Sequence, residues 1–366
     1  MKKLGFGLMR LPKVDGMIDI EQVKTMVDTF IQAGFTYFDT AYVYDQSEEA
    51  FQEAVVKRYP RKNYTIADKL PAWKINEKAD VEKIFRESLQ RCGVEYFDYY
   101  LLHAISGNRS TLFEEFGAYD FCLKMKEEKK ILHFGFSFHG TPELLEEILI
   151  KHPEVDFVQL QLNYLDWDNA IIASRKNYEI CRKYHKQIIV MEPVKGGMLA
   201  NLKPEIANIF KEHSNHSPAS FALRYVASLE GVCMVLSGMS NMQQVEDNLQ
   251  TFTDLQPLSI EESKLVEQVK NEILKSTVVG CTACRYCCSG CPKKINIPEL
   301  FKIYNQLLND GKANLAKACY QNLIDKSLSN HASSCIGCGK CESVCPQHLE
   351  IIAELKKISR FFDQEN

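Results

Sequence analysis

The stretch GFGLMRLP, residues 5–12, decides between two folds for the first three quarters of the chain. It contains two glycines, as a turn that leads into a helix would. The stretch instead runs on into Arg10 and Pro12. An open, doubly wound sheet usually carries a glycine-rich turn after its first strand, directly before a helix. The stretch therefore favours a closed (β/α)8 barrel.

Eight apolar segments along residues 1–275 are expected to form parallel strands, because strands covered on both faces are apolar nearly throughout. Helix-like segments with an apolar stripe lie between them, for example residues 19–34 and 141–152. Eight such pairs within about 250 residues have the size of a TIM barrel. The strand candidates are KLGFGLM, YFDTA, YTIADKL, FDYYLLHA, LHFGFSF, VDFVQLQLN, QIIVMEPV and VCMVLSGM.

The composition is that of a globular protein, with 45% apolar and 25% charged residues. A formal net charge of −4 indicates no basic surface for nucleic acid. No apolar run approaches the roughly 20 residues that span a membrane. The N-terminal segment lacks the apolar region of a signal peptide. We therefore expect a cytoplasmic protein without nucleic-acid or membrane partners.

Polar side chains end three successive strand candidates, where a barrel carries its catalytic residues. These are Asp39, Lys69 and His103, and Tyr44 follows shortly after Asp39. A lysine ammonium beside a phenol lowers the phenol pKa from about 10, and an aspartate would hold that ammonium in place. A histidine could orient a carbonyl oxygen. Each residue alone is more often structural, but the four together indicate proton donation to a carbonyl.

The segments GFGLMRLP, GFTYFDTAYVY, IADKLP, DYYLLH and GFSFHG resemble the aldo/keto reductase superfamily over nearly the whole barrel. The resemblance implies a catalytic tetrad of Asp39, Tyr44, Lys69 and His103, with Tyr44 as the general acid. It also implies hydride transfer between NAD(H) or NADP(H) and a small carbonyl or alcohol substrate, without a catalytic metal.

The resemblance further implies a set of nucleotide contacts. Ser137 and Gln159 suit the nicotinamide carboxamide, and Asn248 suits the adenine. Gly196 and Gly197 match a loop whose backbone amides approach the pyrophosphate. The remaining expected contacts are Gly7, Met9, Met191, Gly238, Met239 and Gln244.

Four of these positions depart from the family pattern. Met191 stands where an aromatic residue often stacks on the nicotinamide. Gly238, Met239 and Gln244 stand where many members hold the 2′-phosphate of NADP with a Lys-Ser pair and an Arg. Phosphate recognition favours cationic forks, so a preference for NADP does not follow, and NAD, weak binding or a different redox partner remain alternatives.

Nine of the fourteen cysteines lie in two groups near the C-terminus. Each group reads C-x2-C-x2-C-x3-C-P, the bacterial ferredoxin run, in which the fourth cysteine binds the other cluster of a two-cluster protein. This pattern predicts two [4Fe–4S] clusters. The first cluster is assigned to Cys281, Cys284, Cys287 and Cys345, and the second to Cys335, Cys338, Cys341 and Cys291.

Two alternatives accompany this assignment. Zinc sites with four cysteines usually combine two separated C-x2-C pairs, which fits these runs less well. Cys288 permits a shifted register, C-x2-C-x3-C-x2-C, but Cys287 preserves the spacing of the second run. We therefore expect iron–sulfur clusters, with Cys288 as a bystander.

Two domains are expected: the barrel over residues 1–275 and a smaller domain over residues 276–366. More than 40 residues separate the cysteine runs, and they have the pattern of two helices. The second domain thus resembles the α-helical ferredoxin domains of succinate dehydrogenase-type proteins. Together the two parts resemble aldo/keto reductases that carry a C-terminal ferredoxin-like domain.

A nicotinamide transfers two electrons as a hydride, whereas a cubane takes one. A flavin, a quinone-like substrate or an external carrier (a ferredoxin or a flavoprotein) would have to mediate between them, although the sequence shows no clear flavin motif. The leading hypothesis is an oxidoreductase whose clusters connect the barrel to such a carrier. The alternatives are an electron-transfer or redox-sensing module with a vestigial tetrad, and a plain reductase with structural clusters.

Overall fold

The computed structural model describes residues 2–275 and 278–363. The chain divides into two compact units, each described here by itself. Unit 1 comprises Met1–Val194 and Asn215–Lys264, and unit 2 comprises Lys195–Ser214 and Leu265–Asn366. The predicted start of the second domain at residue 276 lies outside the described residues, so that boundary remains a prediction. The compact units differ from the predicted domains because Lys195–Ser214 groups with the C-terminal segment.

Unit 1 is built on a closed barrel of eight parallel strands, in the order β1-β10-β9-β8-β7-β6-β5-β4. Each of the eight apolar segments named above overlaps one of these strands, which confirms the predicted (β/α)8 architecture. The strands are β1 (Leu4–Gly7), β4 (Tyr37–Asp39), β5 (Thr65–Pro71), β6 (Phe97–Ile105), β7 (Ile131–Phe138), β8 (Phe157–Gln161), β9 (Gln187–Met191) and β10 (Val232–Gly238).

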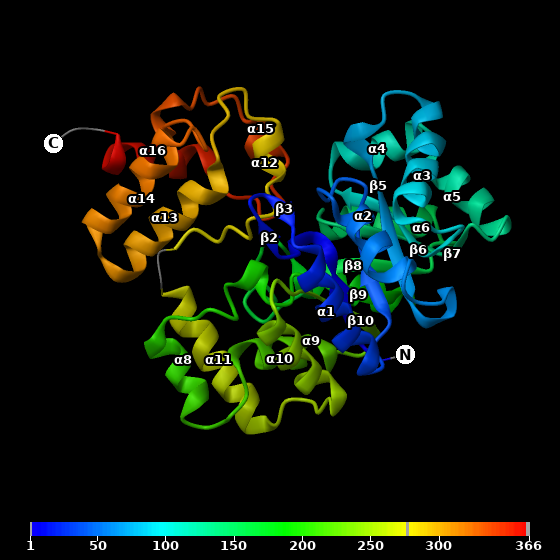
Figure 1. Ribbon diagram of the computed structural model, residues 1–366, viewed down its shortest axis with the longest axis horizontal. Helices are drawn as coiled ribbons and strands as arrows, with labels where there is room; N and C mark the ends of the chain where they lie inside the picture. The colour runs from blue at the N-terminus through cyan, green and yellow to red at the C-terminus, as the bar shows by residue number, and fades with distance from the viewer. Residues whose placement is uncertain (1, 276–277, 364–366) are drawn as a thin grey trace. The chain divides into compact units, whose positions relative to one another are not determined.

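Helices follow or precede these strands, and α3, α5 and α6 lie around β6 and β7 in Figure 1. At the start of α1, α6 and α9, the side chains of Asp19, Thr141 and Ser217 cap the helix by accepting backbone N–H bonds of the first turn. The helices of unit 1 are α1 (Ile20–Gln32), α2 (Ser47–Phe51), α3 (Lys78–Cys92), α4 (Asn108–Glu115), α5 (Ala118–Glu127), α6 (Pro142–Lys151), α7 (Ser174–Lys183), α9 (Pro218–Ala227) and α10 (Met242–Thr253).

The stretch at residues 5–12 behaves as the sequence predicted. Strand β1 is followed by a single 3-10 turn, Leu8–Arg10, and then by the hairpin β2 (Lys13–Val14) and β3 (Met17–Ile18). Gly5 lies inside the barrel, where a Cβ atom would come within 2.7 Å of the side chain of Leu236. Gly5 therefore permits close packing of the barrel interior.

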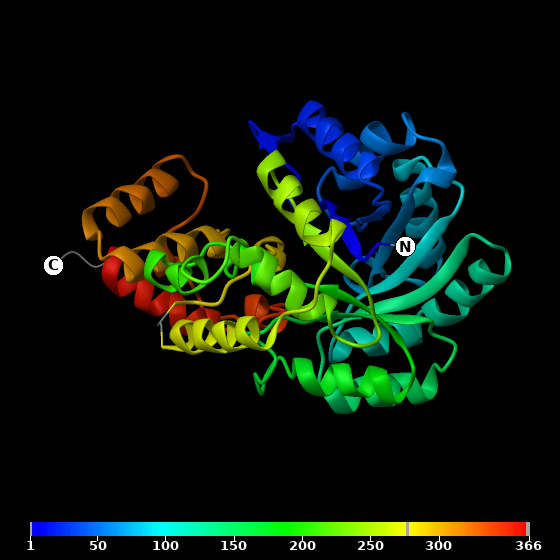
Figure 2. The same ribbon diagram turned by 90° about the horizontal axis from the view of Figure 1, so that it is seen from below.

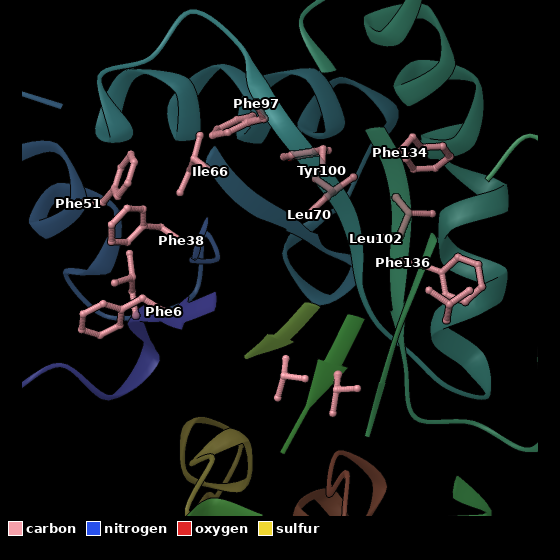
Figure 3. Close-up of a cluster of buried hydrophobic side chains, with 14 of the residues drawn as sticks. Phe6, Phe38, Phe51, Ile66, Leu70, Phe97, Tyr100, Leu102, Phe134 and Phe136 are labelled. Atoms are coloured by element: carbon pink, nitrogen blue, oxygen red, sulfur yellow. The ribbon is translucent and has the colours of Figure 1, made fainter. Parts of the chain in front are cut away.

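Side chains alternate between the two faces of every strand, so each strand contributes to two cores. Tyr37, Ala67, Leu101 and Phe157 are among the residues that fill the barrel interior. Their neighbours point outward into the core between strands and helices, which Figure 3 shows with Phe6, Phe38, Ile66 and Leu102 among its members. Residues two positions after the interior ones face inward again, at the C-terminal end of the barrel.

Unit 2 is helical over its C-terminal part, as expected from the sequence. In Figures 1 and 2 the orange helices α13 and α14 and the red helix α16 lie side by side. Their apolar faces meet in a core that includes Ile297, Leu300, Tyr320 and Leu355. Helix α11 (Ile260–Leu274) begins in unit 1 and continues into unit 2. The other helices of unit 2 are α8 (Pro204–Lys211), α12 (Tyr286–Ser289), α13 (Ile297–Asp310), α14 (Ala313–Asp325), α15 (Lys340–Ser343) and α16 (Ile351–Phe362).

Among the helices of the described residues, none is both long and apolar enough to cross a membrane.

Candidate active site and cysteine cavities

Asp39, Lys69 and Tyr44 meet at the C-terminal end of the barrel. Asp39 and Lys69 face inward because each follows an interior residue, Tyr37 or Ala67, by two positions. The Lys69 Nζ atom lies 2.6 Å from Asp39 Oδ1 and donates to the Thr40 carbonyl at 2.5 Å. It lies 3.5 Å from the phenol oxygen of Tyr44. One ammonium thus connects a buried carboxylate to a partly exposed phenol.

His103 lies on the other side of the phenol. The rings of Tyr44 and His103 are 5.8 Å apart between centroids and nearly perpendicular, at 82°. His103 follows the interior residue Leu101 by two positions, and the imidazole is buried. The structure therefore brings all four residues of the expected tetrad to one end of the barrel.

A bulge in strand β6 fixes the place of His103. The register between β6 and β7 shifts between Leu102 and Ile105, and Ala104 has a positive φ of 56°. The Ala104 N–H group left by the bulge donates to Ser137 Oγ at 2.7 Å. Bulges of this kind commonly redirect a side chain beside an active site. Ser137, expected to touch the nicotinamide, is thus also a positioning residue for His103.

Burial controls the charge of the site residues. Burial, with the nearby Lys69 ammonium as the second cause, holds the pKa of His103 well below its usual range. The imidazole is therefore neutral at physiological pH. Burial also raises the pKa of Asp39, while the charge and hydrogen bond of Lys69 oppose that shift. The arrangement places one cation, one anion and one neutral ring around the phenol.

The expected nicotinamide and adenine contacts are buried polar side chains. Gln159 Nε2 donates to Asp39 Oδ2 at 3.2 Å, which leaves the amide carbonyl of Gln159 for another partner. Ser137 Oγ accepts from Ala104 and keeps its own hydrogen for donation. Asn248 Nδ2 donates to Ser237 Oγ at 2.8 Å. An amide carbonyl and a hydroxyl donor are the groups that a carboxamide requires.

The expected contacts along β1 and β10 occupy different settings. Gly7 pairs in register with both Asp39 and Gly238, so it lies between the tetrad and the end of β10. Met9 lies in the 3-10 turn after β1, and Met191 is the last residue of β9. Met239 is fully buried in the outer core. Gln244 Oε1 accepts a bond from Ser240 N at 2.7 Å.

A cation that the sequence reading missed lies beside Gly238. A Cβ atom on Gly238 would lie 3.3 Å from Arg10 Cδ, so the aliphatic part of Arg10 covers this glycine. The Arg10 guanidinium lies 3.6 Å from the Glu192 carboxylate. The cation comes from the stretch at residues 5–12 instead of from the loop after β10, so the spacing of that loop could not reveal it.

The expected pyrophosphate loop belongs to unit 2 and meets the first cysteine run there. Gly196 has a positive φ of 65°, and a Cβ atom on it would lie 2.6 Å from Thr282 Cα. The backbone of Thr282 therefore closely covers one side of this glycine. Lys195, also buried, donates from Nζ to Gln347 Oε1 at 3.2 Å.

Two further residues of unit 1 lie near His103 and were not singled out from the sequence. The Trp73 ring is 5.2 Å from the His103 ring, and the Arg109 guanidinium stacks 4.6 Å above the Trp73 ring. Arg109 also donates to the Ala104 carbonyl at 3.3 Å. Trp73 comes four residues after Lys69, and this position just beyond a strand end was the available signal.

A buried acidic pair lies behind the tetrad. Asp68 precedes Lys69 and accepts from the Lys69 N–H group at 2.6 Å, and its ligand atoms lie within 4.8 Å of those of Glu48 and Cys92. Burial and the charge of Glu48 raise the pKa of Asp68 well above its usual range. Arg91 pairs with Glu48 at 3.0 Å. Asp68 therefore keeps its proton to a higher pH than an exposed aspartate does.

The eight cysteines of the two runs line two cavities in unit 2, and each cavity takes three cysteines from one run and one from the other. Apart from the cysteines, both walls are largely apolar, with Ile297 shared between them. Cys288 is not among the residues that line either cavity. The first cavity is lined by Cys281, Cys284, Cys287 and Cys345. The second cavity is lined by Cys291, Cys335, Cys338 and Cys341.

This grouping is the one that the ferredoxin run implies, with the fourth cysteine of each run exchanged between the two sites. Two sets of four thiols in apolar walls suit iron–sulfur clusters, which bind through cysteine thiolates. The ligand set of each cluster remains a prediction, and the geometry is compatible with it.

Comparison with protein families gives two matches. The model of the aldo/keto reductase family matches residues 3–271. The model of the 4Fe-4S dicluster domain matches residues 280–350. The first match covers most of the chain, and the second covers both cysteine runs.

Relatives and solved structures match the barrel. A 9,11-endoperoxide prostaglandin H2 reductase of Trypanosoma cruzi is 25% identical over 280 residues, which cover 74% of this chain and 89% of the relative. An L-galactose dehydrogenase of Arabidopsis thaliana is 24% identical and covers 72% and 88%. The holo structure of an aldo-keto reductase from Bacillus halodurans superposes with a TM-score of 0.59 at 23% identity, covering 73% and 91%. This last likeness shows the shared fold.

Proposed function

The chain belongs to the aldo/keto reductase family and carries a C-terminal 4Fe-4S dicluster domain, and from this premise we propose that its barrel transfers hydride between a nicotinamide cofactor and a small carbonyl or alcohol. The observation that carries the proposal is the contact of one ammonium, Lys69, with both Asp39 and Tyr44. Two relatives named a reductase and a dehydrogenase agree with an oxidoreductase.

The side chains at the barrel mouth have different roles at the carbonyl oxygen of the substrate. Tyr44 donates its phenol proton to the carbonyl oxygen of the substrate. The Lys69 ammonium, 3.5 Å away, stabilises the phenolate that remains, and Asp39 keeps that ammonium in place. His103, neutral because of its burial, donates an N–H bond that orients the same oxygen without adding a positive charge.

The nicotinamide dinucleotide, when bound, supplies or accepts the hydride. Ser137 and Gln159 fit its carboxamide, because the first has a hydroxyl hydrogen to donate and the second an amide carbonyl to accept. The choice between NADH and NADPH depends on Arg10, the cation found beside Gly238. Glu192 already engages that guanidinium, and we therefore propose that NADPH is not preferred.

A Tyr44→Phe variant tests the proposed acid. We expect wild-type protein to oxidise NADH or NADPH in the presence of a panel of small aldehydes and ketones. Loss of the phenol proton should reduce kcat by about 10²- to 10⁴-fold, the usual range for a general acid, with little change in nucleotide affinity. Unchanged turnover in the variant would remove Tyr44 from the mechanism.

We propose that the second unit binds two [4Fe–4S] clusters in the two cysteine cavities and exchanges single electrons through them. The thiols and apolar walls of both cavities fit such clusters, and the clusters, when bound, supply one-electron chemistry. Because a hydride carries two electrons, a flavin, a quinone-like substrate or a redox protein must act between the clusters and the nicotinamide. We propose an external ferredoxin or flavoprotein as partner, in the cytoplasm.

One observation favours a second candidate function, an electron-transfer or redox-sensing module in which the tetrad is vestigial. The backbone of Thr282 lies closely against Gly196, which belongs to the loop expected to approach the pyrophosphate. Equilibrium binding of NADH and NADPH to the anaerobically purified protein separates the two. Binding of either nucleotide supports the reductase function. If neither nucleotide binds, the electron-transfer or redox-sensing module is the remaining candidate.

A further inference from the structure

The two cysteine cavities differ in what covers them. The first cavity is lined by the buried side chains of Thr282 and Gln347, and Gln347 is hydrogen-bonded to the buried Lys195. The loop Lys195–Gly197 thus lies against the first cysteine run within unit 2. Of the residues that line this cavity, all among the described residues, Arg285 alone is exposed.

Exposed residues are more numerous around the second cavity, where they are Pro292, Lys293, Ile336, Cys338 and Lys340. Cys338, which lines it, is the only one of the eight predicted ligands that is exposed, all eight being among the described residues. Ile336, beside it in the cavity wall, is 61% exposed although it is a large apolar residue. Added Cβ atoms on Gly337 and Gly339 would meet open space. The second cavity is therefore the one with the more exposed rim.

The rim of the second cavity is apolar at its centre and basic at its edge. Lys293 and Lys340 line the same cavity and are exposed. Glu342, the nearest acidic residue in the sequence, uses its carboxylate to accept the Ile352 N–H bond at 2.8 Å. An exposed apolar centre within a charged border is typical of a surface that binds another protein.

The distribution of charge along the chain indicates the sign of the partner protein's charge. Residues 278–363 contain eleven Lys and Arg against seven Asp and Glu, whereas the whole chain has a net charge of −4. The excess of positive charge is therefore local to the cysteine-rich segment. A basic rim steers negatively charged proteins toward itself and raises their association rate.

We propose that the rim of the second cavity, formed by Pro292, Lys293, Ile336, Cys338 and Lys340, is the docking surface for an acidic one-electron carrier protein. The inference rests on the proposed cluster function and adds the place and the charge of the partner. In the reducing direction the carrier would give up one electron to a cluster held by the four cysteines of the second cavity, with no bond formed and no proton taken.

The test measures the rate at which a photoreduced plant-type ferredoxin, an acidic probe, reduces the oxidised holoprotein. We expect the double variant K293E/K340E to lower the second-order rate constant about tenfold at low ionic strength, with the difference vanishing at high salt. The matched control K302E/K317E makes the same change of charge on α13 and α14, where neither lysine lines a cavity. It should alter the rate far less.

Two further measurements keep the result interpretable. Iron content and reduction by dithionite must match wild type in both variants. If K293E/K340E loses iron, the proposal is tested by the salt dependence of the wild-type rate instead. Electrostatic steering requires that this rate falls as the salt concentration rises. Equal losses in both double variants, or no loss in the rim variant, would overturn the proposal. So would a wild-type dimer that an Ile336→Asp substitution dissociates, because a second copy would then occupy the rim. No nicotinamide or carbonyl enters the assay, so its outcome is independent of the reductase function.

Discussion

The barrel mouth and the cysteine cavities are built in opposite ways. Asp39 and Lys69 are thirty positions apart in sequence and meet because the paired strands β4 and β5 deliver them to the same end of the barrel. Cys281, Cys284 and Cys287 are close in sequence and line one cavity. The described segment that carries them, residues 278–291, contains one short helix, α12, and no strand. The first site is held by the sheet, whereas three of the four cysteines of each cavity are brought together by local turns.

This difference predicts that the structure of the barrel mouth depends less on a bound cofactor than the structure of the cysteine cavities does. The ammonium of Lys69 already has Asp39 and the Thr40 carbonyl as partners, so the mouth of the barrel is organised by protein groups alone. The cysteine cavities expose thiols to one another across apolar walls and gain their strongest bonds only from metal. We therefore expect the two regions to respond independently when one is disrupted.

Removal of a cluster ligand should have the largest effect. A Cys341→Ser variant is expected to lose about half of the iron and to expose residues 278–363 to protease, because metal binding and folding are coupled in such sites. The barrel should keep its far-UV signal and its nucleotide-dependent activity. Iron analysis and limited proteolysis measure the effect, and Cys288→Ser, which removes a thiol outside both cavities, is the control. Parallel unfolding of the barrel would contradict the separation of the two regions.

The ion pair at the barrel mouth should give the next largest effect. Lys69→Met leaves the buried Asp39 without its cation and is expected to cost about 3–5 kcal/mol of unfolding free energy as well as activity. The double variant D39N/K69M should recover much of the stability, because it removes both charges, but none of the activity. Denaturant unfolding and turnover are the measurements. Equal stability of the single and double variants would show that the pair is not coupled.

The acidic pair behind the tetrad gives a pH-dependent prediction. The pKa of Asp68 is raised well above its unfolded value of about 3.9, so between the two values the folded chain holds more protons than the unfolded chain. Stability from this group is therefore present at low pH and lost as pH rises through the folded value. Asp68→Asn should flatten this decline in a series of Tm measurements. Asp45→Asn, an exposed carboxylate whose pKa is lowered by its Lys13 partner, should not.

Nucleotide preference should show the smallest effect. Arg10 pairs with Glu192 near the surface, and such a pair is worth at most about 1 kcal/mol. Glu192→Gln removes this anionic partner and should shift the NADPH-to-NADH ratio of kcat/KM by up to about fivefold toward NADPH. Glu230→Gln, which removes an exposed partner of Arg182, is the control. A ratio unchanged by Glu192→Gln would mean that Arg10 does not approach the 2′-phosphate.

The sequence predicted the barrel because its eight strands are continuous apolar runs, and this pattern can be recognised without knowledge of the tertiary contacts. It predicted the positions of Asp39, Lys69 and His103 because strand ends in such a barrel converge at one place. The C-x2-C-x2-C-x3-C spacing likewise anticipated which thiols share a cavity. In each case a short, local pattern determines the outcome.

Other features depend on side-chain direction and were not visible in the sequence. The side chain of Arg10 covers Gly238, although the two residues are far apart in sequence. They come together because strand β1 pairs with strand β10. The bulge at Ala104 that ties Ser137 to His103 leaves no compositional signal. The grouping of Lys195–Ser214 with unit 2 likewise depends on contacts such as Lys195 with Gln347, which are distant in sequence.

The most direct test of the account follows a labelled hydride. The anaerobically purified protein is given NADH or NADPH that carries deuterium at the transferable position, together with a carbonyl that it reduces. The account predicts deuterium on the carbinol carbon of the product for the wild type and for a Cys341→Ser variant, and its loss in Tyr44→Phe. A product alcohol without deuterium, formed only while the clusters are intact, would contradict hydride transfer at the barrel mouth.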